Sequence, residues 1–144
     1  MVSRTLLLLT LALLVSACSS VQAQTIPDAT PPLGGESNPR ALAAAEQGEL
    51  GKPTIVFFHA QWCNVCRRAR PIIDALAQEH ADSLAVVRMD IDDHEAEGAV
   101  DRYRVNATPT FILFSADGNV LASIPGWPGR EVMESAIRQM LGTN

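Results

Sequence analysis

The chain has 144 residues, which is the length of one domain with a short additional segment. Its 11 basic and 16 acidic residues give a formal net charge of −5, and an acidic chain without a basic stripe argues against nucleic acid as the partner. The hydrophobic share of 47% is inflated by an apolar N-terminus, so the rest of the chain has a more ordinary composition.

Residues 1–17 have the pattern of a signal peptide. Arg4 is followed by a leucine-rich run that is shorter than the roughly 20 apolar residues of a comfortable transmembrane helix. Residues 14–18 (LVSAC) resemble the lipobox of bacterial lipoproteins, with valine in place of the more usual leucine at Val15. This resemblance implies that Cys18 becomes the first residue of the mature protein and carries lipid. An ordinary cleaved signal or a short anchor is the alternative.

Export would place the protein where disulfides persist, and lipid would tether it without spanning the membrane. We expect it at the periplasmic face of the cell envelope. Ser19 stands where an aspartate would resemble an inner-membrane retention signal, which favours the outer membrane over the inner one. Residues 18–38 are rich in Ser, Thr, Pro and Gly, without helical or strand periodicity, and are predicted to form a flexible tether.

The folded domain is predicted to cover residues 39–144. Asn38 has the character of a helix N-cap with Pro39 at the first helical position, and Gly48 is a plausible stop for that helix. Residues 54–58 (TIVFF) form a nearly continuous apolar and β-branched run. Such a run is typical of a central strand that is covered on both faces.

The remaining elements follow from hydrophobic periodicity and turn residues. Strands are expected at residues 84–89, 110–114 and 120–124, the last two joined by a turn containing Asp117-Gly118. Helices are expected at residues 64–80, 93–104 and 129–141. Pro71 is expected to kink the first of these helices. The last is expected to bury one apolar stripe, formed by Val132, Met133, Ala136, Ile137, Met140 and Leu141.

This order of elements predicts an α/β fold with helices on both faces of a mixed four-stranded sheet. Strands separated by helices are expected to be parallel, with right-handed crossovers. The final hairpin has to be antiparallel.

Two of the three cysteines, Cys63 and Cys66, are three residues apart at the predicted start of a helix. This spacing is typical of a dithiol that closes to a disulfide and reopens. A structural disulfide or half of a zinc site would also fit a bare pair. Zinc needs two further ligands, and the only nitrogen donors are His59, His80 and His94, without a second paired motif. We therefore expect no metal and no cofactor.

Several motifs together resemble the thioredoxin family over roughly residues 40–142. Trp-Cys-x-x-Cys (residues 62–66) follows a strand, and a proline (residue 71) lies in the next helix. Asp-Ile-Asp (residues 90–92) follows the next strand, Thr-Pro-Thr (residues 108–110) precedes the hairpin, and a glycine (residue 126) follows it. Residues 41–53 resemble an exported branch of this family, related to the reducing domain of the transmembrane disulfide reductase. The resemblance implies a thioredoxin-like fold and a thiol:disulfide oxidoreductase.

The resemblance also implies roles for individual residues. Cys63 is the attacking cysteine, whose thiolate the helix N-terminus favours, and Cys66 resolves the mixed disulfide. Pro109 matches the family's cis-proline opposite the dithiol. Its cis peptide bond would leave the backbone of Thr108 free to pair with an extended substrate, and Trp62 is expected to be a partly exposed platform beside the site.

One position departs from the family. Thioredoxin has a buried aspartate six residues before the first cysteine, where it helps to deprotonate the resolving cysteine, whereas this chain has Phe57. His59 is expected on the same strand face by the two-residue period. Our hypothesis is that His59 tunes the thiol pKa values or relays protons; the alternative is a packed or surface histidine. Arg67, Arg68 and Arg70 add positive charge near the pair, or are simply solvated.

The sequence therefore predicts a monomeric, membrane-tethered oxidoreductase that reduces protein disulfides and is itself kept reduced by a transmembrane thiol–disulfide electron donor. The two residues between Cys63 and Cys66 do not fix the direction of the reaction. The alternative from another class is an adaptor, chaperone or Cu(I)-binding module of the same fold, whose thiols capture a partner without turnover.

Overall fold

The structure is a computed structural model that describes residues 37–143. These residues belong to one compact unit. The predicted signal, Cys18 and the tether up to residue 36 lie outside the described residues. Within residues 37–143, no helix is long and apolar enough to cross a membrane.

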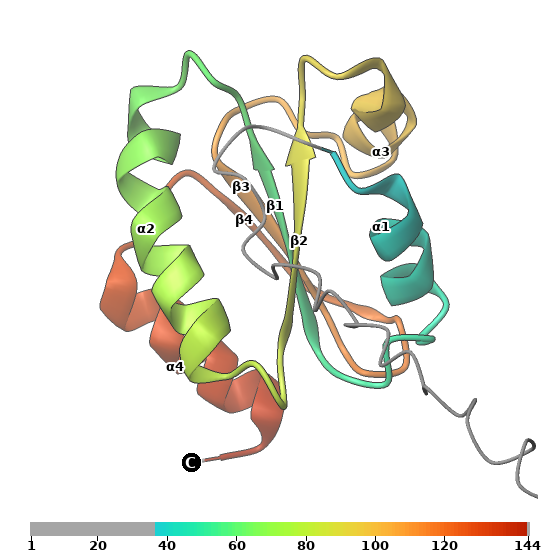
Figure 1. Cartoon of the computed structure of the whole chain (residues 1–144), viewed down its shortest axis with the longest axis vertical. Coiled ribbons are helices and arrows are strands. Elements are labelled where there is room, and N and C mark those ends of the chain that lie inside the picture. Colours follow the sequence, from blue (N-terminus) through green and yellow to red (C-terminus); the bar gives the residue numbers. More distant parts are fainter. Residues whose placement is uncertain (1–36, 144) are drawn as a thin grey trace, which may run out of the picture. The chain divides into compact units, whose positions relative to one another are not determined.

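Four strands form one mixed sheet in the order β2-β1-β3-β4 (Figure 1). They are β1 (Thr54–His59), β2 (Ala85–Asp90), β3 (Thr110–Phe114) and β4 (Val120–Pro125). Strands β1 and β2 are parallel, whereas β3 is antiparallel to both β1 and β4. The four-stranded mixed sheet and the antiparallel hairpin are thus confirmed.

The expectation that β3 would be parallel, because a helix precedes it, was wrong. The connection from β2 contains a short 3-10 helix, η1 (His94–Ala96), and α3 (Glu97–Arg102), followed by residues 103–109 without a helix or strand. This last segment leads back to the same end of the sheet as the C-terminus of β2, as Figure 1 shows. Because the connection returns to its starting end, β3 has to run in the opposite direction to β2.

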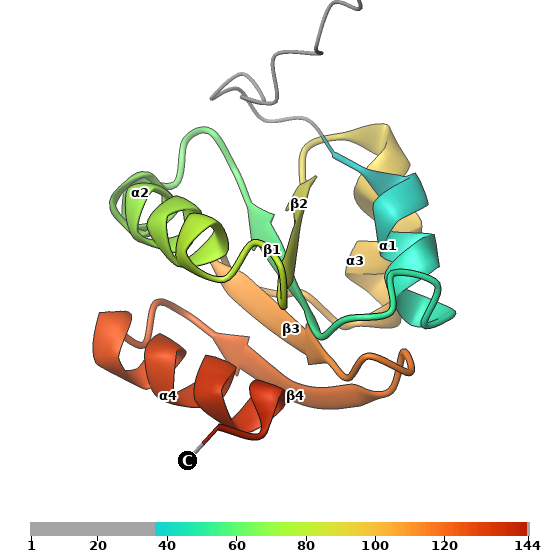
Figure 2. The same cartoon turned by 60° about the horizontal axis from the view of Figure 1, so that its bottom comes forward.

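The helices cover both faces of the sheet. Helices α2 (Asn64–Glu79) and α4 (Arg130–Leu141) lie on one face, and α1 (Pro39–Glu46) lies with α3 on the other (Figures 1 and 2). Helix α2 continues through Pro71. The expected layers of helix, sheet and helix are therefore present.

Strand β1 is buried along its whole length and divides the core into two clusters. Its side chains alternate between the two faces, as the strand period requires. Ile55 and Phe57 belong to the cluster that contains Cys66 and the inner residues of α2 and α4. Val56 and Phe58 belong to the cluster beneath α1 and α3. The central strand thus holds both layers together and leads directly to the cysteine pair.

The buried stripe of α4 is narrower than its sequence suggested. Met133 and Ile137 are fully buried, but Val132 is 53% exposed. Because successive helical residues are separated by about 100° around the helix axis, Val132 lies beyond the edge of a stripe that Met133 and Ile137 define. The expectation that Val132 would be buried was wrong.

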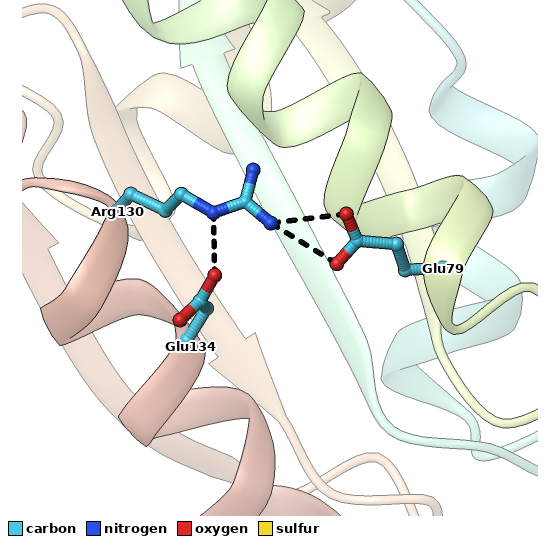
Figure 3. A network of polar contacts seen from close by, with 3 residues as sticks. All are labelled: Glu79, Arg130 and Glu134. Atoms are coloured by element: carbon cyan, nitrogen blue, oxygen red, sulfur yellow. Dashed lines mark hydrogen bonds and ion pairs between the residues drawn. The ribbon is translucent and has the colours of Figure 1, made fainter.

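Arg130 links the N-terminus of α4 to the C-terminus of α2 (Figure 3). Its Nη2 lies 3.0 Å from Oε1 of Glu79, and its Nε lies 2.5 Å from Oε1 of Glu134. Exposed ion pairs of this kind contribute little free energy. The packing of α2 against α4 therefore depends on the apolar residues beneath this network.

The start of α1 is fastened to the edge strand β2. The side chain of Asn38 accepts a hydrogen bond from the N–H of Ala41, which confirms it as the N-cap. The Asn38 N–H donates to the carbonyl of Arg88 at 3.1 Å, and the N–H of Asp90 donates to Oγ of Ser37 at 3.0 Å. Ser37 and Asn38, placed at the end of the tether by their sequence, thus make contacts with the folded domain.

Candidate functional site

Cys63 is the N-cap of α2, which places its sulfur at the end of the helix. Its Sγ accepts a hydrogen bond from the backbone N–H of Cys66 at 3.0 Å. Residues Ala60 to Cys63 form a tight turn between β1 and α2, closed by a hydrogen bond from the Cys63 N–H to the Ala60 carbonyl. The free N–H groups and the dipole of the helix N-terminus favour a negative charge on this sulfur once the disulfide is reduced.

Cys63 and Cys66 form a disulfide bond with a Cα–Cα distance of 5.2 Å. The two sulfurs differ in access, since Cys63 is 5% exposed and Cys66 is completely buried. A substrate disulfide can therefore reach Cys63 before Cys66. This asymmetry suits one cysteine to attack and the other to resolve.

The loop before β3 lies opposite Cys63. The Thr108–Pro109 peptide bond is cis, as the family resemblance implied. The carbonyl oxygen of Thr108 lies 3.5 Å from Sγ of Cys63. Pro109 is buried, and its carbonyl accepts a hydrogen bond of 2.7 Å from the N–H of Gly126. Strand β3 therefore starts beside the sulfur that a substrate would meet.

Trp62 extends from the same turn and is 64% exposed. Its Nε1 donates a hydrogen bond of 2.7 Å to Oδ2 of Asp92, in the loop after β2. Asp92 was part of the Asp-Ile-Asp motif that supported the family resemblance, but no role was assigned to it. The structure adds Asp92 to the site because it orients the exposed indole beside the disulfide.

Phe57 fills the position where thioredoxin has a buried aspartate. Its ring stacks on Phe111, with ring centroids 4.9 Å apart, and it belongs to the cluster that contains Cys63 and Cys66. This position therefore carries no group that accepts a proton, and the proton from Cys66 has to leave by another route.

His59 is completely buried and lies on the same face as Phe57, with their ring centroids 5.2 Å apart. Its Nδ1 lies 3.3 Å from Nη2 of Arg70, on α2. Desolvation by burial, followed by the charge of Arg70, lowers the pKa of His59 from 6.5 to about 4. The proximity of Asp90 acts in the opposite direction and does not reverse the shift.

Sequence reasoning noted Arg70 only as one of several arginines near the dithiol, and it did not predict the contact with His59. Of its neighbours, Arg67 contacts Asn64 at the exposed start of α2, away from this contact. The only signal in the sequence is the four-residue spacing from Cys66 to Arg70, which places both side chains on one helix face. Within residues 37–143, no group of three or more His, Cys, Asp or Glu side chains is arranged to hold a metal ion.

The comparisons agree with this geometry. The family model described as thioredoxin matches residues 45–139. A thioredoxin from Alicyclobacillus acidocaldarius is 30% identical over 97 residues, which cover 67% of this chain and 88% of that protein. The chloroplastic thioredoxin-like protein HCF164 of Arabidopsis thaliana is 33% identical over 86 residues, or 60% of this chain. The matched region is only 33% of the length of HCF164.

A solved structure gives the same result for the fold. The crystal structure of thioredoxin O2 from Arabidopsis thaliana, in its oxidised state, superimposes with a TM-score of 0.60 at 28% sequence identity. The superposition covers 71% of this chain and 84% of that one.

Proposed function

This chain belongs to the thioredoxin family, and from that premise we propose that it is a thiol:disulfide oxidoreductase of the cell envelope that reduces disulfide bonds in proteins. One observation carries the proposal. The Cys63–Cys66 disulfide has its more accessible sulfur at a helix N-terminus and within 3.5 Å of the Thr108 carbonyl. A purely structural disulfide needs neither feature.

The reaction begins from the reduced dithiol. The Cys63 thiolate attacks one sulfur of the substrate disulfide, and the other substrate sulfur leaves with the electron pair of the broken bond and takes up a proton. Cys66 then loses its proton and attacks Sγ of Cys63. This second step forms the Cys63–Cys66 disulfide and releases the second substrate thiol, so two electrons pass from the protein to the substrate.

The groups around Cys63 suit an extended polypeptide as the substrate. The N–H of Thr108 makes no hydrogen bond with any described residue, and Thr108 lies before the first residue of β3. It is thus available to an added backbone strand, with the exposed ring of Trp62 as an apolar contact. These two groups hold the substrate while Cys63 carries out the exchange.

The location of the protein rests on Cys18 and on the signal that precedes it. Lipid on Cys18 would hold the domain at the periplasmic face of a membrane, on the outer membrane rather than the inner one. A transmembrane thiol–disulfide donor would return the oxidised Cys63–Cys66 pair to the dithiol. A Cys18→Ser variant is expected to leave the membrane fraction, and the mass of the mature N-terminus would identify the lipid.

The direction of the reaction is tested by the potential of the dithiol in glutathione buffers. Thioredoxin-like folds span about −270 to −120 mV, and a reductant is expected near the lower end of this range. A Cys66→Ser variant is expected to accumulate mixed disulfides on Cys63, and a Cys63→Ser variant is the control that forms none. Full activity in Cys63→Ser would refute the oxidoreductase and favour an adaptor or Cu(I)-binding module.

A further inference from the structure

A group of charged and polar side chains lies between α2 and the edge of the sheet formed by β1 and β2. His59 pairs with Asp90 in the parallel register, and Phe57 pairs with Arg88. From α2, Arg70 contacts His59 and Asp74 forms an ion pair with Arg88. The proposed reaction assigns no role to these residues, although His59 lies only four residues before Cys63.

The contact with Arg70 determines which nitrogen of His59 carries hydrogen. A guanidinium group has donors only, so Nδ1 of His59 has to accept from Nη2 of Arg70 at 3.3 Å. The hydrogen of the neutral ring is therefore on Nε2, which is buried without a hydrogen-bond partner among the described residues. The low pKa of His59, about 4, agrees with a ring that is neutral at pH 7.

A neutral histidine in this arrangement is a poor proton acceptor. Its one lone pair on nitrogen is engaged by Arg70, and protonation there would place a second positive charge against the guanidinium. His59 therefore does not take the place of the buried carboxylate that Phe57 lacks. Its ring instead provides an acceptor for Arg70 inside the protein.

Arg70 lies one helical turn after Cys66. Side chains at positions i and i+4 of a helix are neighbours, with Cβ atoms about 5–6 Å apart. Helical side chains also point back toward the N-terminus, so that of Arg70 extends over the turn that contains Cys66. The contact with His59 holds the guanidinium on the inner side of α2, toward the sheet.

The elements packed around this site carry three further charged side chains, Asp74, Arg88 and Asp90. Asp74 is two turns along α2 from Cys66 and forms an ion pair with Arg88. A carboxylate oxygen of Asp90 accepts the N–H of Asp92 at 3.1 Å. Strand β3 and helix α4 contribute apolar residues to the cluster around Cys66, namely Phe111, Leu113, Met133 and Ile137.

We propose that Arg70, positioned by neutral His59, stabilises the thiolate of the resolving cysteine, Cys66, and so replaces by a positive charge the buried carboxylate that this chain lacks. The inference rests on the proposed function. In the resolving step, the proton of Cys66 passes to solvent, its sulfur bonds to Sγ of Cys63, and the electron pair of the broken bond leaves with the substrate sulfur. Arg70 takes no proton and acts only through its charge.

The experiment follows a single turnover of the reduced protein with an equimolar amount of the aromatic disulfide dithiobis(nitrobenzoate). Attack by Cys63 releases one coloured thionitrobenzoate in a bimolecular phase. Attack by Cys66 on the mixed disulfide releases the second, in a phase whose rate does not depend on protein concentration. The pH dependence of each phase therefore reports one cysteine.

Four variants distinguish the roles. Arg70→Gln is expected to slow the second phase about tenfold at pH 7 and to raise the pH of its half-maximal rate by about one unit, with the first phase changed less than twofold. Arg70→Lys is expected to recover most of the rate. His59→Gln, which keeps an acceptor for Arg70, is expected to remain close to the wild type, whereas His59→Leu is expected to fall between the wild type and Arg70→Gln.

Arg68→Gln is the matched control, because it removes the same charge from an exposed position of α2. An equal effect of Arg68→Gln and Arg70→Gln, or an unchanged second phase in Arg70→Gln with its folding verified by thermal unfolding, would overturn the inference. A second phase lost equally in His59→Gln and His59→Leu would also overturn it and identify His59 as a proton carrier. Absence of the first phase in the wild type would instead contradict the proposed function.

Discussion

The indole nitrogen of Trp62 donates a hydrogen bond to Asp92, a residue 30 positions further along the chain, although most of the Trp62 ring is exposed. This bond joins the turn before α2 to the loop after β2. An exposed aromatic side chain normally samples several rotamers, and ordering it on binding costs free energy. The hydrogen bond to Asp92 already restricts the Trp62 side chain in the free protein. We therefore expect that less free energy is lost in ordering Trp62 when a substrate binds beside Cys63.

Replacing Asp92 by alanine is expected to release the indole. A hydrogen bond of this kind contributes about 1 kcal/mol, so KM for a protein disulfide is expected to rise roughly fivefold, with kcat changed less than twofold. Fluorescence anisotropy of Trp62 in a Trp127→Phe background is expected to fall. Asp82→Ala, a change at an exposed carboxylate after α2, is the control. Unchanged anisotropy in Asp92→Ala would show that packing alone orients the ring.

Phe57, which replaces the buried aspartate of thioredoxin, is also expected to make a large contribution to the stability of the fold. Truncating a buried phenylalanine to alanine costs about 3–5 kcal/mol, and Phe57 is fully buried against Phe111. Phe57→Asp, which restores the carboxylate of thioredoxin, is expected to cost more at pH 7 because the charge is buried among apolar groups. Urea unfolding of both variants measures these differences.

The direction in which the unfolding free energy of Phe57→Asp changes with pH can be predicted. Burial raises the pKa of a carboxyl group above its unfolded value of about 3.9. The folded variant then binds more protons than the unfolded chain, so its stability relative to Phe57→Ala is expected to increase as the pH falls from 7 toward 4. A relative stability that decreases over this range would mean that the carboxylate is stabilised as an ion.

His59 is expected to give the wild type the opposite dependence. Its pKa is 6.5 in the unfolded chain and about 4 in the folded protein, so the unfolded chain binds the extra proton between these values. The contribution of neutral His59 is complete above pH 6.5 and is lost as the pH falls toward 4, with a total of at most about 3 kcal/mol. The difference in unfolding free energy between wild type and His59→Gln is expected to shrink over this range. A constant difference would place the folded pKa near 6.5.

Tyr103 provides a separate test on the other face of the sheet. Its hydroxyl contacts Oε1 of Glu46, which also binds Arg102, so the three side chains join α1 to α3. Burial, and then the bond to Glu46, raises the pKa of Tyr103 to about 12. The chain contains one tyrosine, so the ultraviolet absorbance of tyrosinate reports this group alone. The midpoint is expected near pH 12.

A Glu46→Gln variant separates the two causes of that shift. Removing the carboxylate is expected to lower the midpoint, but not as far as 10, because burial is the larger cause and remains. A midpoint unchanged by Glu46→Gln would assign the whole shift to burial. A midpoint at 10 would show that the ring is solvated once the carboxylate is gone.

Local features were the ones that could be predicted from the sequence. The N-cap at Asn38 and the helix that begins after Cys63 depend on residues within a few positions of each other. The direction of β3 could not be read in this way, because it depends on the path by which residues 103–109 return to the sheet. The same holds for Val132, whose exposure depends on how α4 is rotated against its neighbours.

In the candidate site, too, the residues set by local sequence were predicted and the contacts set by packing were not. The cysteine pair and Pro109 were recognised from short motifs, because the residues beside them in the sequence identify these motifs. The contact between His59 and Arg70 joins residues 11 apart on a strand and a helix, and it depends on how α2 packs over β1. An aspartate at position 57 could have been recognised from its spacing before Cys63. The contact between His59 and Arg70 has no such sequence pattern and is seen only in the folded structure.

Ser37 and Asn38 are fastened to β2 close to Asp90, at the same end of the domain as the start of α2. Figure 1 shows the other end of the chain at the opposite side, beyond the C-termini of α2 and α4. The two attachment points of this domain are thus unequal. We expect a fusion partner joined directly before Ser37 to start at the end of the domain that carries the start of α2, and so to restrict the access of large substrates to Cys63 more than that of small ones. A partner joined after Thr143 starts at the opposite end and is expected to leave this access unchanged.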